Sequence, residues 1–126
     1  MPKQPKKLLA AVEDLFFTVK ITDAAKRAGL AVEFIKNDKE LLEKAKEEKP
    51  AVIIFDLNFN GMQPLKAISK LKGNPELKSI SLIGYLSQVQ GELKQKAIEL
   101  GCDMVMARAA LSLNLAQILK RHAGTP

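Results

Sequence analysis

The sequence predicts one α/β domain built on a five-stranded parallel sheet. Short runs of apolar and β-branched residues alternate five times with longer amphipathic runs. The run at residues 51–55 is wholly apolar, as is typical of a central strand covered on both faces. Repeated strand–helix alternation favours a parallel sheet with helices on both faces, because each helix returns the chain to the same edge.

The expected elements follow from the period of the apolar residues. The expected strands cover residues 7–12, 30–35, 51–55, 80–85 and 103–107. The expected helices cover residues 16–28, 39–48, 65–72 and 91–100, and a fifth helix begins after Ser112.

Local signals set the ends of the first two helices. The helix at 16–28 carries an apolar stripe and is expected to stop at Gly29, which can adopt the left-handed conformation. Asp38 is the expected N-cap of the helix at 39–48, and Pro50 follows it as a breaker. That helix is expected to bury Leu41, Leu42 and Ala45.

The later helices have similar signals. Pro64 suits the first turn of the helix at 65–72. The helix at 91–100 is expected to end at Gly101 and to turn Leu93, Ala97 and Leu100 inward. Ser112 is the expected cap of the fifth helix, whose buried residues would be Leu115, Ile118 and Leu119.

Size and composition are those of a globular domain. The 126 residues are 47% hydrophobic and 27% charged, which argues against disorder. We expect a basic N-terminal tail at 1–6, a domain at 7–122 and a C-terminal tail at 123–126. The single cysteine, Cys102, favours a reducing compartment such as the cytoplasm. The apolar run at 51–55 is too short to span a bilayer, so no membrane insertion is expected.

Candidate site residues lie where the expected strands end, because ligands bind outside the carboxyl ends of parallel strands. Glu13 and Asp14 follow the first strand, Asp56 follows the third, and Arg108 follows the fifth. Three carboxylates would meet at one edge with a guanidinium beside them. A divalent cation that prefers oxygen ligands, Mg²⁺ or a similar ion, would relieve their repulsion.

With Gly101 ahead of the last strand, these residues make the chain resemble a receiver domain of the response-regulator family of two-component signalling. The resemblance covers residues 7–121 and implies a flavodoxin-like (CheY-like) fold with five helices and strand order 2-1-3-4-5. It also implies that Asp56 is the phosphoacceptor, whose carboxylate attacks phosphorus. The implied metal ligands are Glu13, Asp14, Asp56 and the backbone carbonyl of Asn58.

The chain departs from the family pattern at several positions. Arg108 stands where the family has lysine, and it carries its charge on a longer planar group. Leu86 occupies the position of the family's hydroxyl residue, and Ser87, which could supply a hydroxyl, comes one residue later. Val105 replaces the family's switch aromatic residue.

The resemblance implies a stand-alone module of a two-component phosphorelay. Its partners would be a histidine kinase or other phosphodonor protein and a downstream target protein. We expect no organic cofactor and no enzyme activity beyond self-phosphotransfer onto Asp56. The implied contact surface consists of the fourth helix, the fifth strand and the fifth helix, through which a homodimer could also form. The residues expected to be exposed there are Gln88, Val89, Gln90, Leu111 and Leu113.

Two alternatives stay open. A pseudo-receiver would share the fold but bind a partner constitutively, with Arg108 paired to Asp56 in place of a metal. A basic nucleic-acid-associated module is the weaker alternative and rests on the net charge of +6 alone. We do not expect nucleic-acid binding, because the basic residues are spread along the chain without interleaved aromatic residues.

Overall fold

The computed structural model describes residues 6–59, 61–87 and 90–122. Five parallel strands form one sheet in the order β2-β1-β3-β4-β5. The strands are β1 (Lys6–Ala11), β2 (Leu30–Phe34), β3 (Val52–Asp56), β4 (Ser81–Leu86) and β5 (Met104–Ala107). The helices are α1 (Leu15–Ala28), α2 (Asp38–Glu48), α3 (Pro64–Lys72), α4 (Gly91–Glu99) and α5 (Arg108–His122). The predicted fold class, with its strand order and five helices, is confirmed.

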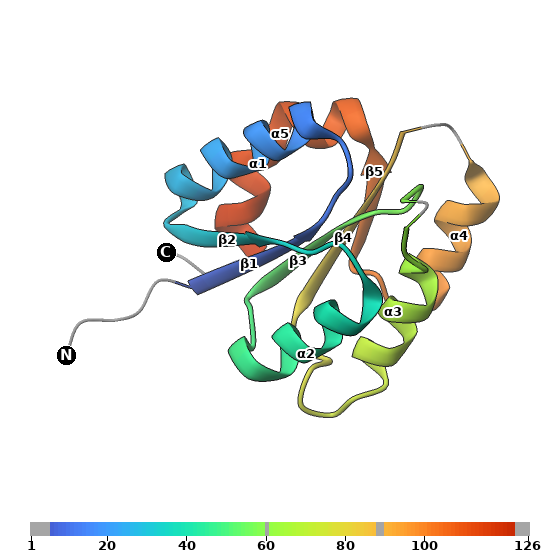
Figure 1. Ribbon diagram of the computed structural model, residues 1–126. Helices are drawn as coiled ribbons and strands as arrows, with labels where there is room; N and C mark the ends of the chain where they lie inside the picture. Colours follow the sequence, from blue (N-terminus) through green and yellow to red (C-terminus); the bar gives the residue numbers. More distant parts are fainter. Residues whose placement is uncertain (1–5, 60, 88–89, 123–126) are drawn as a thin grey trace.

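The helices form a layer on each face of the sheet (Figure 1). On one face, α1 and α5 pack on side chains such as Leu8, Ile54 and Tyr85. On the other face, α2, α3 and α4 cover the alternate strand residues, including Leu9 and Phe55. The alternation of side chains along each strand therefore divides the core into two apolar clusters, one on each side of the sheet.

β3 lies at the centre of the sheet because it pairs with β1 on one side and β4 on the other. All five of its residues are buried, and residues 52–55 of the predicted apolar run are among them, whereas Ala51 is only half-buried. Asp56 is the last residue of β3 itself and pairs in register with Tyr85 of β4. The central position of β3 places this aspartate in the middle of the carboxyl edge.

Several helix ends differ from the expectations. Asn37, not Asp38, is the N-cap of α2, since its extended backbone lets the side chain accept a hydrogen bond from the Glu40 amide at 2.8 Å. Asp38 is the first helical residue and accepts hydrogen bonds from the Gln63 amide, which ties α2 to the start of α3. Gly29 adopts a φ of 75° and ends α1 as predicted.

The fifth helix begins five residues earlier than predicted. Arg108 follows β5 directly as the first residue of α5, so Ser112 lies inside the helix and is not its cap. The residues between them are good helix formers and contain no breaker, so the helix extends back to the strand. The expected burial of Leu115, Ile118 and Leu119 is confirmed.

α4 packs on the sheet through fewer residues than predicted. Only Ala97 is buried, whereas Leu93 is half-buried and Leu100, which lies just beyond the helix end, is exposed. Leu42 of α2 is likewise only partly buried. In the part of the chain that the structure describes, no helix is long and apolar enough to cross a membrane.

Candidate functional site

The carboxylate of Asp56 is at the centre of the candidate site. Asp56 is only 6% exposed, and among the described residues it is the one polar or charged residue that is buried. Its Oδ1 accepts a hydrogen bond from the backbone amide of Asn58 at 2.9 Å. One backbone donor only partly replaces the hydrogen bonds with water that a carboxylate loses when it is buried.

The pKa of Asp56 is raised above its usual value. Burial is the largest cause, and the negative charges of Glu13 and Asp14 act in the same direction. The Asn58 hydrogen bond and the positive charge of Arg108 oppose the shift. The residues predicted to meet at the carboxyl edge therefore do influence one another electrostatically.

Asp14 has two structural roles. Its Oδ1 caps α1 by accepting hydrogen bonds from the amides of Phe16 at 2.8 Å and Phe17 at 3.3 Å. Its Oδ2 forms an ion pair with the guanidinium of Arg108. Glu13, the preceding residue, is exposed. Asp14 thus joins the start of α1 to the start of α5 at the edge of the site.

Arg108 pairs with Asp14 and not with Asp56, so the pairing expected of a pseudo-receiver is not the one observed. The reason is the early start of α5, which places Arg108 above the first turn of α1. Its guanidinium carbon lies 5.4 Å from the centre of the Phe17 ring, a cation–π distance. The Phe17 ring in turn contacts Tyr85, with 4.6 Å between ring centres.

The expected metal ligands are not assembled in this arrangement. Among the described residues, no group of three His, Cys, Asp or Glu side chains is placed to hold a metal ion. Both oxygens of Asp14 are already engaged, one by helix amides and one by Arg108. A divalent cation bound by Asp14 would first have to displace this guanidinium.

The last residue of β4, Leu86, carries no hydroxyl. Leu86 is buried in the cluster under α2, α3 and α4, on the opposite side from Tyr85. Ser87 is exposed, and its backbone amide donates to Oδ1 of Asn58 at 2.9 Å. The Asn58 side chain also donates to Gln90, so Asn58 ties the loop after β3 to the start of α4.

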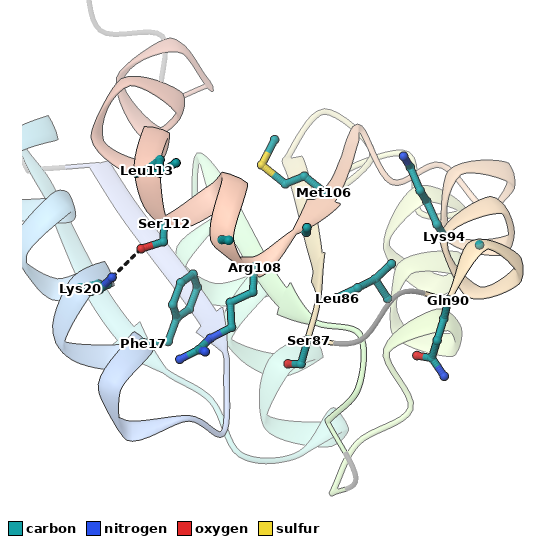
Figure 2. A pocket seen from close by; sticks show the side chains of 13 residues that line it. Phe17, Lys20, Leu86, Ser87, Gln90, Lys94, Met106, Arg108, Ser112 and Leu113 are labelled. Carbon is teal, nitrogen blue, oxygen red and sulfur yellow. Dashed lines mark hydrogen bonds between the residues drawn. The ribbon is translucent and has the colours of Figure 1, made fainter.

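A groove of about 750 Å³ lies beside this site (Figure 2). The ends of β4 and β5 and the first turns of α4 and α5 line it, together with Phe17 and Lys20 of α1. Lys20 donates a 2.7 Å hydrogen bond to Oγ of Ser112, so Ser112 links two helices instead of capping one. Two residues of the predicted contact surface, Gln90 and Leu113, line this groove.

The exposure expected of residues on the predicted contact surface is confirmed for some of them and wrong for one. Leu113 is 85% exposed and Gln90 is also exposed, as predicted. Leu111 is fully buried on the inward side of α5, so its predicted exposure is wrong. It shares the inward stripe of α5 with Leu115, one helical turn later. Gln88 and Val89 lie outside the described residues.

No family model matches the sequence, and no curated protein matches it either. Solved structures do match, at low sequence identity. A putative response regulator from Chloroflexus aurantiacus is 18% identical, with a TM-score of 0.82 over 95% of this chain and 98% of that one. The chemotaxis response regulator CheY4 of Vibrio cholerae is 21% identical, with a TM-score of 0.79 over 94% and 99% of the two chains.

The Mn²⁺-bound form of response regulator Rcp1 is a third similar structure. It is 15% identical, with a TM-score of 0.75 over 93% of this chain and 91% of that one. These matches cover nearly the whole of each chain, and they agree with the strand order and helix count described above. The chain therefore has the fold of a response-regulator receiver domain.

Proposed function

We propose that this chain is a receiver-type signalling module that acts by protein contact, with Asp56 as the phosphoacceptor. The observation that supports this most is the placement of Asp56. It is a buried carboxylate at the end of the central strand, beside two further acidic residues and a guanidinium. A purely structural aspartate at such a position would be expected to have more hydrogen-bond donors, since unpaired burial of its charge is costly.

The chemistry of the proposal is a transfer to one carboxylate oxygen. Asn58 occupies Oδ1 of Asp56, which leaves Oδ2 as the nucleophile. Oδ2 forms a bond to phosphorus while the bond from phosphorus to the donor's leaving group breaks, and its electron pair departs with that group. Arg108 is the nearby positive charge that would balance the added negative charge. The chain acts as a phosphoryl acceptor, with self-phosphotransfer as its only reaction.

The partners in this proposal are a histidine kinase or another phosphodonor protein and a downstream target protein. The free, buried Cys102 agrees with a reducing compartment, and we propose a cytoplasmic location. The described residues do not fit a divalent cation while Asp14 holds Arg108, so we assign no step to Mg²⁺. The Mn²⁺-bound relative is the reason to include divalent cations in the test below.

A second candidate is a pseudo-receiver that binds its partner without phosphorylation. The ion pair between Arg108 and Asp14 favours it, because this pair engages a carboxylate that a metal would need. The buried Leu86 at the position of the family's hydroxyl residue also favours it. In this candidate the surface that contacts the partner is permanently formed.

Intact-mass measurement after incubation with acetyl phosphate, with and without Mg²⁺, separates the two candidates. The proposal expects a mass gain of one phosphoryl group in the wild type and none in Asp56→Asn. Asp23→Asn is the matched control, because Asp23 is an exposed aspartate on α1. Its ion pair is with Arg27, one turn later on the same helix. The control should be modified as the wild type is. Absence of any mass gain, or an equal gain in Asp56→Asn, would exclude Asp56 as phosphoacceptor and leave the pseudo-receiver.

A further inference from the structure

The hydroxyl of Tyr85 is a buried donor without an acceptor. The Tyr85 side chain is wholly shielded from solvent, and no described residue forms a hydrogen bond with its hydroxyl. Buried polar groups in folded proteins are nearly always hydrogen-bonded, because leaving the bond unmade costs free energy. A hydroxyl that the resting protein leaves unpaired points to an acceptor that is present in another state of the site.

Tyr85 is a direct neighbour of the proposed phosphoacceptor. Asp56 pairs with it in register on the adjacent strand, so the two backbones lie about 4.8 Å apart. Asp56 follows Ile54 by two residues, and both Ile54 and Tyr85 lie on the face covered by α1 and α5. Because side chains alternate along a strand, the carboxylate and the phenol leave the sheet on that same face. The charge of Asp56 is accordingly the largest cause, after burial, of the raised pKa of Tyr85.

Arg108 supplies a second unpaired donor at this site. Its Nε is buried and has no hydrogen-bond partner among the described residues, although another nitrogen of the guanidinium pairs with Asp14. Figure 2 shows the guanidinium beside the Phe17 ring, and the same ring contacts Tyr85. Phe17 therefore contacts the side chains of both unpaired donors.

The acceptor at the site is short of donors in the resting protein. The structure gives the Asp56 carboxylate one hydrogen bond, from the amide of Asn58. A phosphoryl group on Asp56 would lengthen this side chain and add three acceptor oxygens with their negative charge. The site therefore contains spare donors next to the residue on which new acceptors would be placed.

We propose that the Tyr85 hydroxyl binds the phosphoryl group on Asp56 by donating a hydrogen bond to one of its oxygens. The proposal rests on the proposed function, in which Asp56 is the phosphoacceptor, and it adds a phosphoryl-binding residue to that site. The phenol keeps its proton, since its raised pKa leaves it protonated in the neutral range. A hydrogen bond to a charged oxygen is about twice as strong as one between neutral groups.

Ser87 is the competing source of a hydroxyl, because it lies two residues further along, just past the end of β4. Ser87 is exposed, so its hydroxyl can already form hydrogen bonds with water. Exchanging water for a phosphoryl oxygen gains little free energy. The buried Tyr85 hydroxyl has no such bond to give up, and it gains the whole of the new one.

The test compares affinities for beryllium fluoride, a mimic of the phosphoryl group, measured by amide chemical shifts with and without Mg²⁺. Tyr85→Phe removes the hydroxyl and keeps the ring, and it should bind about tenfold more weakly than the wild type. Ser87→Ala is the matched control, since it also removes one hydroxyl, and it should bind as the wild type does. Tyr85→Phe removes an unpaired polar group, so the resting protein should not be destabilised and weaker binding would not reflect a damaged fold.

Intrinsic fluorescence reports the hydrogen bond by a second route. Tyr85 is the only tyrosine and the chain has no tryptophan, so tyrosine emission comes from this side chain alone. The emission should fall when beryllium fluoride binds, because an excited phenol gives up its proton more readily to an anionic oxygen. Ser87→Ala should show the same fall, and Asp56→Asn should show none.

Several outcomes would overturn this inference while the proposed function stands. In each of them the wild type gains phosphoryl mass on Asp56, but it binds no beryllium fluoride, binds it as Tyr85→Phe does, or keeps its tyrosine emission unchanged. Weaker binding in Ser87→Ala alone would assign the role to Ser87. If the wild type neither gains phosphoryl mass nor binds beryllium fluoride, the proposed phosphoacceptor is wrong, and the role of Tyr85 is excluded with it.

Discussion

Replacing Tyr85 with phenylalanine should make the protein more stable. The Tyr85 side chain is fully buried, and its hydroxyl has no hydrogen-bond partner among the described residues. Burial, together with the nearby charge of Asp56, raises the pKa of this phenol, so it stays protonated throughout the neutral range. The Tyr85→Phe variant keeps the ring and its 4.6 Å contact with Phe17 while removing the unpaired group.

The expected size of the effect follows from two opposing terms. An unpaired buried hydroxyl costs about 1–3 kcal/mol relative to water. The void left by its oxygen costs a few tenths of a kcal/mol, at about 24 cal/mol per Å³. The free energy of unfolding should therefore rise by about 1 kcal/mol, which corresponds to an increase of roughly 4 °C in Tm for a domain of this size.

Urea denaturation at several pH values between 5 and 8 is the appropriate assay. The gain should be the same at each pH, because the phenol does not titrate in this range. Phe55→Leu is the control, since Phe55 is equally buried but has no polar group, and it should lose about 1 kcal/mol. A loss of stability in Tyr85→Phe would show that the hydroxyl has a partner, and the reasoning would then be wrong.

Three further predictions concern charge and backbone conformation. Because the folded-state pKa of Asp56 is raised, the folded protein binds its proton more tightly than the unfolded chain does. The free energy of unfolding should thus fall as pH rises from about 4 through the folded-state pKa. Asp56→Asn should remove this fall and be the more stable protein at pH 7 in urea titrations; a less stable variant would contradict the assignment. Asp14→Asn keeps a good helix cap but loses the half-exposed ion pair with Arg108, so it should lose about 0.2–1 kcal/mol at low salt and less at high salt. Gly29→Ala should lose about 1 kcal/mol from its φ of 75° alone, since an added Cβ would meet nothing within 4 Å. Gly91→Ala, at an equally open position without positive φ, should lose nothing by thermal denaturation, and equal losses in both would contradict this account.

The sequence was sufficient for the architecture because each local signal agreed with the overall fold. The alternation of apolar runs and amphipathic runs predicted the parallel sheet, and the wholly apolar run predicted that β3 is central. The strand order came from the family resemblance rather than from these patterns. Boundaries were less accurate where no breaker marks them, as at the start of α5, where helix-forming residues continue back to the strand.

The sequence also placed Asp56 at the carboxyl edge, because strand direction alone decides which residues reach that edge. Which of the charged groups there contact one another was a matter of three-dimensional packing. Arg108 could have paired with either aspartate, and the packing of α1 against α5 brought it to Asp14. The groove, which is lined by Lys20 and Lys94 from separate helices, likewise exists only after those helices pack on the sheet. Periodicity along a chain fixes which side of an element is buried, but distances between side chains of different elements depend on how those elements pack together.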